Sequence, residues 1–143
     1  MNKMLSRQAR FLEKSFKAIG MRNIITKTML NPKRRSRNEE PPKSYYKKYR
    51  YETRVIHGCK CVTLSKTENS KKHVLYFHGG AYTMQAQKSQ WRIVDALLQR
   101  TGCSVTFINY PLSPEHTCRD TISMATESYS FYCGTGETEI ILA

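Results

Sequence analysis

The stretch HVLYFHGGAY, residues 73–82, joins an apolar run to a histidine and two adjacent glycines. Glycine is a poor strand former and reaches backbone conformations closed to other residues, so Gly79 and Gly80 predict a loop. Because glycine has no Cβ atom, a substrate can approach this backbone closely. We expect the loop to point N–H groups at an oxygen that becomes negative in a transition state, where one such donor contributes about 3 kcal/mol.

The elements that position this loop follow an alternating order. Apolar, β-branched runs predict strands at 51–56, 59–64, 73–78, 103–110 and 138–143. Helical spacing predicts one helix from a Ser89 cap to Gly102 and another from Cys118 to Tyr132. The fold class is therefore α/β, a parallel sheet with crossover helices. His57-Gly58 predicts an antiparallel hairpin before the parallel strands. The glycine loop then lies at the carboxyl edge of the sheet, where open α/β folds bind ligands.

The first 50 residues differ from the rest. Leu5, Ala9, Leu12, Phe16 and Ile19 recur at helical steps, which predicts an amphipathic helix. A second short helix is expected before Pro32, and the polar, proline-bearing residues 31–48 predict a linker. We therefore divide the chain into a basic helical leader, cap and linker (1–50) and an α/β domain (51–143). Our hypothesis is that the apolar stripe of the leader caps the substrate entrance.

Charge is concentrated in the same region. The net charge is +13, with 16 basic and 4 acidic residues in 1–54 against 8 and 7 in 55–143. A basic segment suits a membrane surface or nucleic acid, although many are only solvated faces. Tyrosines interleave with lysines and arginine over 43–51, which suits a phosphate-bearing partner. An ordinary linker that packs its tyrosines onto the domain explains the same residues.

The composition of the chain also indicates its cellular location and whether a metal or cofactor is expected. The sequence has no apolar run of about 18 residues, and charges interrupt its N-terminus where a secretory signal would be apolar. Five cysteines, an odd number, predict free thiols in the cytoplasm. Cys59 and Cys61 have the spacing of one strand face rather than of a zinc knuckle. We expect no metal and no cofactor.

Two motifs carry a resemblance to a known family. HGGAY (78–82) follows one predicted strand and NYPLSPEH (109–116) follows the next, as in the esterases and lipases related to hormone-sensitive lipase. The resemblance covers about residues 51–143 and implies the N-terminal half of an α/β-hydrolase sheet. It also implies an oxyanion hole formed by the N–H groups of Gly79, Gly80 and Ala81, with His78 bracing the loop. The substrate would be a small or medium acyl ester.

The chain departs from the family in several places. Ala81, Asn109, Pro111 and Ser113 stand where glycine, aspartate, arginine and alanine are common, which affects the expected acyl selectivity more than the chemistry. None of the twelve serines lies in a G-x-S-x-G elbow, and the acid and base that would follow are also missing. We therefore expect a truncated carboxylic-ester hydrolase that is inactive and poorly stable alone. The alternative is a non-catalytic module that binds a membrane surface or nucleic acid through residues 1–54, with nucleic acid the less favoured partner.

We expect no catalytic role for the other candidate residues. Adjacent Glu115 and His116 seldom act on one proton, and the family places this pair in a structural loop. His57 and His73 are expected to face solvent. Replacement of Gly80 is expected to lower turnover while stability changes little.

Overall fold

The computed structural model of the chain describes residues 6–29, 31, 39–67, 70–134 and 139–143. It divides the chain into two compact units, Met1–Arg35 and Ser36–Ala143. Part of the linker expected over 31–48, at 32–38, lies outside the described residues, as does Leu5 of the apolar stripe.

The first unit contains the two expected helices. They are α1 (Arg7–Ala18) and α2 (Met21–Met29). The Ser6 hydroxyl caps α1 by accepting a hydrogen bond from Ala9 N at 3.2 Å, and Gly20 separates the helices in the left-handed conformation with φ 64°. No residue of α1, and none of residues 21–27 in α2, is buried. Of the apolar stripe, Leu12, Phe16 and Ile19 are exposed and Ala9 is half-buried.

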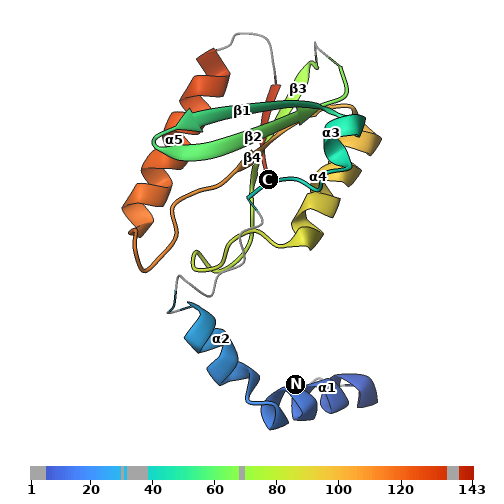
Figure 1. The fold of residues 1–143 in the computed structure, drawn as a ribbon, viewed down its shortest axis with the longest axis vertical. Helices are drawn as coiled ribbons and strands as arrows, with labels where there is room; N and C mark the ends of the chain where they lie inside the picture. Colours follow the sequence, from blue (N-terminus) through green and yellow to red (C-terminus); the bar gives the residue numbers. More distant parts are fainter. Residues whose placement is uncertain (1–5, 30, 32–38, 68–69, 135–138) are drawn as a thin grey trace, which may run out of the picture. The chain divides into compact units, whose positions relative to one another are not determined.

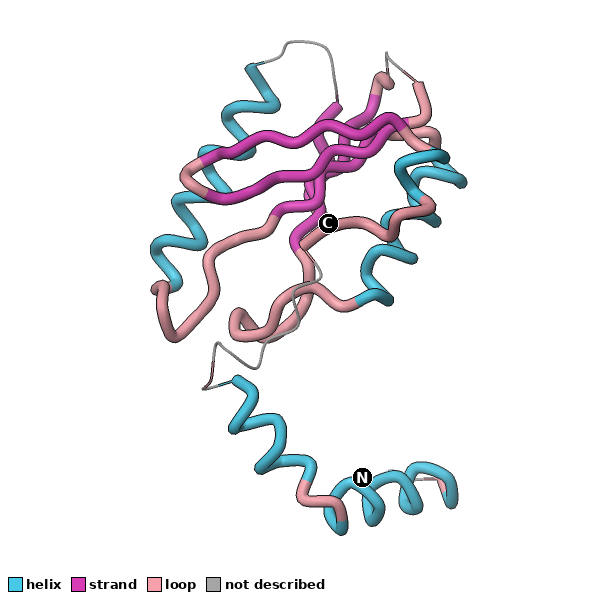
Figure 2. Tube along the Cα trace, in the orientation of Figure 1, coloured by secondary structure: helices cyan, strands magenta, loops and turns pink. Residues whose placement is uncertain are grey.

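The second unit is a five-stranded mixed sheet between helices, which confirms the predicted fold class (Figures 1 and 2). Its strands are β1 (Arg50–Ile56), β2 (Cys59–Ser65), β3 (Lys72–Phe77), β4 (Ser104–Ile108) and β5 (Glu139–Leu142), and its helices are α3 (Tyr45–Lys48), α4 (Lys88–Thr101) and α5 (Cys118–Gly134). The strand order is β1-β2-β4-β3-β5. β2 is antiparallel to β1 and β4, whereas β3 is parallel to β4 and β5.

The hairpin between β1 and β2 has the expected two-residue turn. His57 and Gly58 both have positive φ angles, 49° and 72°, as a type I′ turn requires. The register pairs Ile56 with Cys59 directly across this turn. The His57 side chain lies 2.8 Å from the Glu127 carboxylate on α5, so the turn is attached to that helix.

Each face of the sheet is covered by one long helix (Figure 1). Trp91 of α4 stacks on Phe107 of β4 with ring centroids 4.1 Å apart, and Val94 and Leu98 extend this core. On the other face, Met124 of α5 belongs to a second buried cluster with residues of β3 and β4. Alternating residues along β3 and β4 serve the two clusters, as expected for strands buried on both sides.

The segment before β1 packs against the domain rather than extending as a linker. The Tyr45 hydroxyl donates to Trp91 O at 3.2 Å, and Tyr49 is 5% exposed within the core under α4. Lys48 forms an ion pair with Asp95 at 2.6 Å. Residues 45–49 therefore belong with the second compact unit, Ser36–Ala143. Of the two explanations for the tyrosines, the contacts of Tyr45 and Tyr49 favour packing onto the domain.

The start of α4 differs from the prediction. Gln87, not Ser89, caps the helix through a reciprocal capping box with Gln90. The predicted stop is confirmed, since Gly102 is left-handed with φ 67°.

His73 does not face solvent as expected. Its Nε2 atom lies 2.7 Å from the Thr106 hydroxyl, and its ring packs on Tyr132 with centroids 4.6 Å apart. Burial lowers the pKa of His73 to about 4, against a smaller opposing effect of Glu52. The expectation failed because α5 covers this end of β3, which the position of His73 at a strand start does not reveal.

The free energy of unfolding should therefore decrease as the pH falls. The folded-state pKa of His73 lies below its unfolded value of 6.5. Its contribution is fully present above pH 6.5 and is lost as the pH falls towards 4, by up to about 3 kcal/mol. Urea unfolding at pH 7, 6, 5 and 4 should show a steeper loss for the unsubstituted chain than for His73→Gln. Parallel pH profiles for the two proteins would contradict this assignment.

Candidate functional site

The glycine loop leaves the carboxyl end of β3 and leads to α4. Its first residue, His78, is 2% exposed and stacks on Tyr110, with ring centroids 4.4 Å apart. The Tyr110 hydroxyl donates a hydrogen bond to the His78 carbonyl. Further along, Ser113 N donates to Tyr82 O at 2.8 Å. The two sequence motifs therefore contact each other, because residues after β4 hold the loop after β3.

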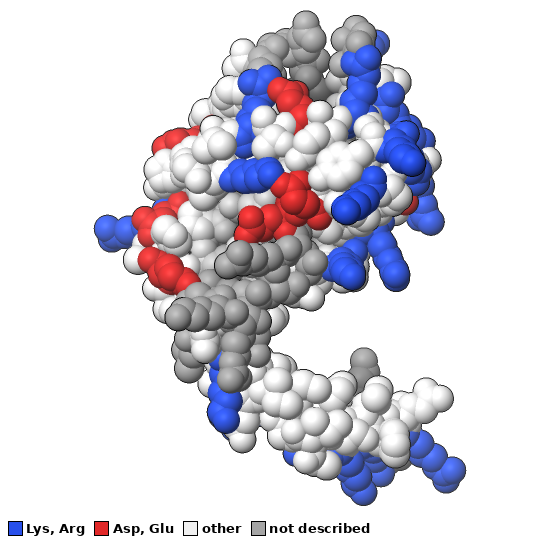
Figure 3. Space-filling model, viewed as in Figure 1, with Lys and Arg blue, Asp and Glu red and all other residues white. Residues whose placement is uncertain are grey.

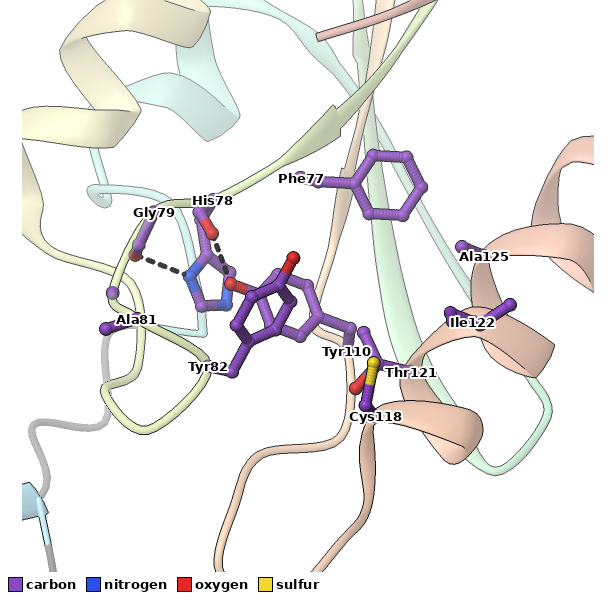
Figure 4. A pocket seen from close by; sticks show the side chains of 11 residues that line it. Phe77, His78, Gly79, Ala81, Tyr82, Tyr110, Cys118, Thr121, Ile122 and Ala125 are labelled. Carbon is purple, nitrogen blue, oxygen red and sulfur yellow. Dashed lines mark hydrogen bonds between the residues drawn. The ribbon is translucent and has the colours of Figure 1, made fainter.

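The protonation of His78 follows from its contacts. Its Nδ1 atom lies 3.0 Å from Gly79 O, and a carbonyl only accepts, so Nδ1 carries the proton (Figure 4). Burial lowers the pKa of His78, although the hydrogen bond to Gly79 opposes this effect. The ring is therefore neutral at pH 7. Its Nε2 atom is buried without a hydrogen-bond partner among the described residues. These contacts are those of a residue that could brace the loop.

Gly80 occupies a backbone conformation reserved for glycine, with φ 147°. Its carbonyl accepts from Thr83 N at 3.1 Å and Met84 N at 3.0 Å, which closes a tight turn. A Cβ atom at this position would lie 2.5 Å from the Met84 carbonyl oxygen. The expectation that a substitution here spares stability is therefore wrong, because the side chain would meet backbone.

Ala81 and Tyr82 also adopt left-handed conformations, with φ 52° and 56°. For residues with a Cβ atom this conformation costs about 1–2 kcal/mol each. Ala81 thus holds, with a Cβ atom, a conformation that glycine adopts more readily. The hydrogen bond from Ser113 N to Tyr82 O helps to hold this strained segment.

The N–H groups of the loop differ from its carbonyls in their hydrogen bonding. Among the described residues, none accepts a hydrogen bond from the backbone N–H of Gly79, Gly80 or Ala81. All three residues line an open pocket of about 460 Å³ (Figure 4). Across this pocket lie Cys118, Thr121, Ile122 and Ala125 of α5, and the aromatic rings of Phe77 and Tyr110 also line it. The arrangement offers free donors to an oxygen beside a mainly apolar wall.

The remaining candidates lie elsewhere. Glu115 and His116 are exposed and do not line the pocket. Asn109 is 8% exposed and donates from Nδ2 to Glu39 O at 3.4 Å, so it ties the segment before α3 to the end of β4. Within the described parts of the chain, no three His, Cys, Asp or Glu side chains are grouped to hold a metal ion.

Two contacts of the loop were missed from the sequence. Tyr110 belongs to the second motif, but nothing in that motif identifies its hydroxyl as the donor to His78. Gln90 donates from Nε2 to Gly79 O at 2.8 Å. The spacing of Gln87 and Gln90 is that of a capping box and could have indicated an ordered helix start, though not the contact with the loop.

Comparison with known proteins agrees with this geometry. Residues 74–137, which contain both motifs, match the family described as alpha/beta hydrolase fold. No curated protein matches the chain. The resemblance inferred from the two motifs is thus confirmed over the segment that carries them.

Solved structures of similar fold are esterases. An esterase from the bacterial hormone-sensitive lipase family has a TM-score of 0.60 at 19% identity, with 73% of this chain and 35% of that chain covered. An esterase/lipase from an uncultured bacterium has a TM-score of 0.58 at 18% identity, covering 87% and 46%. EstE5 has a TM-score of 0.60 at 18% identity, covering 84% and 38%. The chain spans less than half of the length of each.

The two loop glycines should respond differently to alanine. At Gly79 an added Cβ would lie 3.4 Å from Gln90 Nε2, an ordinary van der Waals distance, whereas at Gly80 it would meet backbone. Gly79→Ala should cost less than about 1 kcal/mol, and Gly80→Ala about 2 kcal/mol or more. Urea unfolding of both variants measures the difference. Equal costs would show that the loop does not have this conformation.

Proposed function

We propose that this α/β-hydrolase-fold chain supplies the oxyanion-hole half of a carboxylic-ester hydrolase, with Gly80 and Ala81 as the principal donors and Gly79 beside them. The observation that carries the proposal is that no described residue accepts from the N–H groups of these residues, which lie beside an apolar pocket. An unpaired backbone donor is unfavourable unless water or a ligand accepts from it. A carbonyl oxygen that gains negative charge is such an acceptor.

The chemistry assigned to the loop is electrostatic. When a nucleophile attacks an ester carbon, the carbonyl oxygen becomes an oxyanion, and donors fixed before the reaction stabilise it without reorganising. His78 positions the loop as a neutral donor to Gly79 O and does not move a proton. Serine, acid and base are assigned to sequence other than these 143 residues, which contain no G-x-S-x-G motif. We propose that the chain alone is inactive.

The substrate class follows from the pocket and the resemblance together. Phe77, Ile122 and Ala125 supply apolar surface facing the loop. We propose a small or medium acyl ester, with the acyl chain against this surface and the carbonyl oxygen at the loop. We propose a cytoplasmic location, which the five free thiols support.

Ester hydrolysis tests this function directly. The 143-residue chain should release no p-nitrophenol from acetate, butyrate or octanoate esters above a denatured control, because it has no elbow serine to acylate. A polypeptide that continues past Ala143 through a G-x-S-x-G elbow should hydrolyse the shorter esters and be blocked by a serine-directed phosphonate.

Two results would contradict the proposal. One is phosphonate-sensitive turnover by the 143-residue chain. The other is a folded, elbow-bearing polypeptide that hydrolyses none of the esters.

A second candidate function is binding to an anionic membrane surface through the first unit. Residues 1–35 contain ten Lys and Arg and one Glu, a net charge of +9. Phe11, Leu12 and Phe16 on α1 are 71%, 52% and 50% exposed. Basic and apolar side chains on one helix suit the boundary between lipid head groups and acyl chains. Within the described residues, no helix has the length and apolar character needed to cross a bilayer.

Charge in the second unit is more balanced. In Figure 3 basic side chains gather on the side that carries α3 and α4, and acidic side chains lie nearer the middle of the sheet and α5. The Tyr46 and Tyr51 hydroxyls both donate to Glu40, and Tyr49 is buried. Tyr46 and Tyr51 are exposed, but their hydroxyls are bound to Glu40, so stacking of these tyrosines on nucleic acid bases is not favoured.

Vesicle sedimentation tests the membrane function. The chain should sediment with phosphatidylserine-containing vesicles and not with pure phosphatidylcholine. Phe11→Ala should weaken this binding about tenfold through lost apolar burial. Val55→Ala, a matched control at an equally exposed position (71%) in the second unit, should not. Absence of binding, with altered acyl-chain selectivity on deletion of residues 1–30 in an elbow-bearing polypeptide, would favour the cap hypothesis instead.

A further inference from the structure

We propose that Gln90, a residue of α4, sets the direction of the Gly80 N–H group by holding the Gly79 carbonyl; this role rests on the function proposed above. Gln90 Nε2 donates to Gly79 O at 2.8 Å. His78 Nδ1 donates to the same oxygen at 3.0 Å. The two donors use the two lone pairs of this carbonyl.

The geometry of the peptide bond transmits this contact to Gly80. Residues 79 and 80 are joined by a trans peptide, since the cis bond in the described chain is Ser113–Pro114. In a planar trans peptide the C=O and the following N–H point in opposite directions. A Gly79 carbonyl held towards α4 and His78 therefore directs the Gly80 N–H away from them. No described residue accepts from this N–H, and Gly80 lines the pocket.

Gln90 and His78 do not act equivalently. His78 is the residue before Gly79, so its contact is local to the loop and does not attach the loop to α4. Gln90 belongs to α4, whose Trp91 and Val94 are buried in the core. The contact from Gln90 therefore ties the loop to a fixed element of the fold.

The orientation of the Gln90 amide is itself fixed. Its Oε1 atom accepts from Gln87 N, while the Gln87 side chain accepts from Gln90 N. With the oxygen engaged by the helix start, the Nε2 group is left to face Gly79. Gln87 Nε2 also donates to Gln85 O at 3.1 Å, which attaches the end of the loop to the same cap. The capping box thus serves both the helix and the loop.

Gln90→Glu separates these two roles. A carboxylate can still accept from Gln87 N, and a negative charge in the first turn suits the helix dipole, so α4 should remain capped. The same carboxylate cannot donate to Gly79 O and repels it. The matched control is Gln99→Glu, the same substitution near the other end of α4, where Gln99 Nε2 donates to the Tyr49 hydroxyl.

The first measurement uses the 143-residue chain and does not depend on catalysis. In ¹⁵N–¹H spectra, Gln90→Glu should shift or broaden the amide signals of Gly80 and Ala81, while the urea midpoint stays at or above that of the unsubstituted chain. Gln99→Glu should leave both loop signals in place. Unchanged Gly80 and Ala81 signals in Gln90→Glu would overturn the proposal, as would loop changes that appear only with a general loss of stability.

The second measurement uses an elbow-bearing polypeptide. Gln90→Glu should lower kcat about 10- to 100-fold with KM nearly unchanged, because a displaced donor weakens binding of the transition state more than of the substrate. Gln99→Glu should retain kcat. An active parent with unaffected kcat in Gln90→Glu would refute the positioning role alone. An inactive parent would refute the proposed function, while the spectra would still decide the loop geometry.

Discussion

The hydrogen bonds that engage the carbonyls at the end of β3 determine what the loop can do. The carbonyls of His78, Gly79, Gly80 and Tyr82 each accept a hydrogen bond, from Tyr110, from Gln90 and His78, from the turn at 83–84, and from Ser113 respectively. The N–H groups of residues 79–81 have no acceptor among the described residues. Within each trans peptide the C=O and the following N–H point in opposite directions, so carbonyls held on one side leave the N–H groups directed to the other. The pocket lies where these donors are presented.

This arrangement requires both halves of the surrounding sheet. β3 and β4 are parallel neighbours, with Phe77 paired to Ile108, so the segments that follow them emerge side by side. Tyr110 and Ser113 can then reach the loop from the second motif. α4 completes the support, because its first turn contacts Gly79 while its middle is buried. The left-handed conformations of Ala81 and Tyr82 are maintained by this surrounding structure.

Much of the fold could be predicted from local pattern. The hairpin at His57-Gly58, the order of strands and helices, and the stop at Gly102 follow from residue types with specific backbone preferences. The features that the sequence pattern did not predict depend on tertiary contacts. Polar, basic residues 43–50 resemble a linker, yet Tyr45 and Tyr49 dock on α4. His73 begins a strand as a surface residue would, but α5 covers it. Gln87 rather than Ser89 is the cap, because α4 begins at Lys88 and Ser89 lies inside its first turn.

In the candidate site, too, the sequence pattern predicted the position of the loop but not the contacts that fix its conformation. The motif predicted a loop containing Gly79, Gly80 and Ala81 at the carboxyl edge of the sheet, and the structure has these residues lining a pocket there. The motif could not show that Gly80 is required by the Met84 backbone, because this depends on the path of the turn. Nor could it identify Gln90, which is eleven residues from Gly79 and reaches it only through the packing of α4.

The central claim is that Gly80 and Ala81 donate to an oxyanion. The most direct measurement is the structure of an elbow-bearing polypeptide that contains this chain, with its serine bound covalently to a phosphonate that mimics the tetrahedral intermediate. We expect a phosphonyl oxygen about 2.7–3.1 Å from the backbone nitrogens of both residues, with the Gly79 carbonyl still bound by Gln90. A phosphonyl oxygen directed away from residues 79–81, with their N–H groups bonded elsewhere, would contradict it.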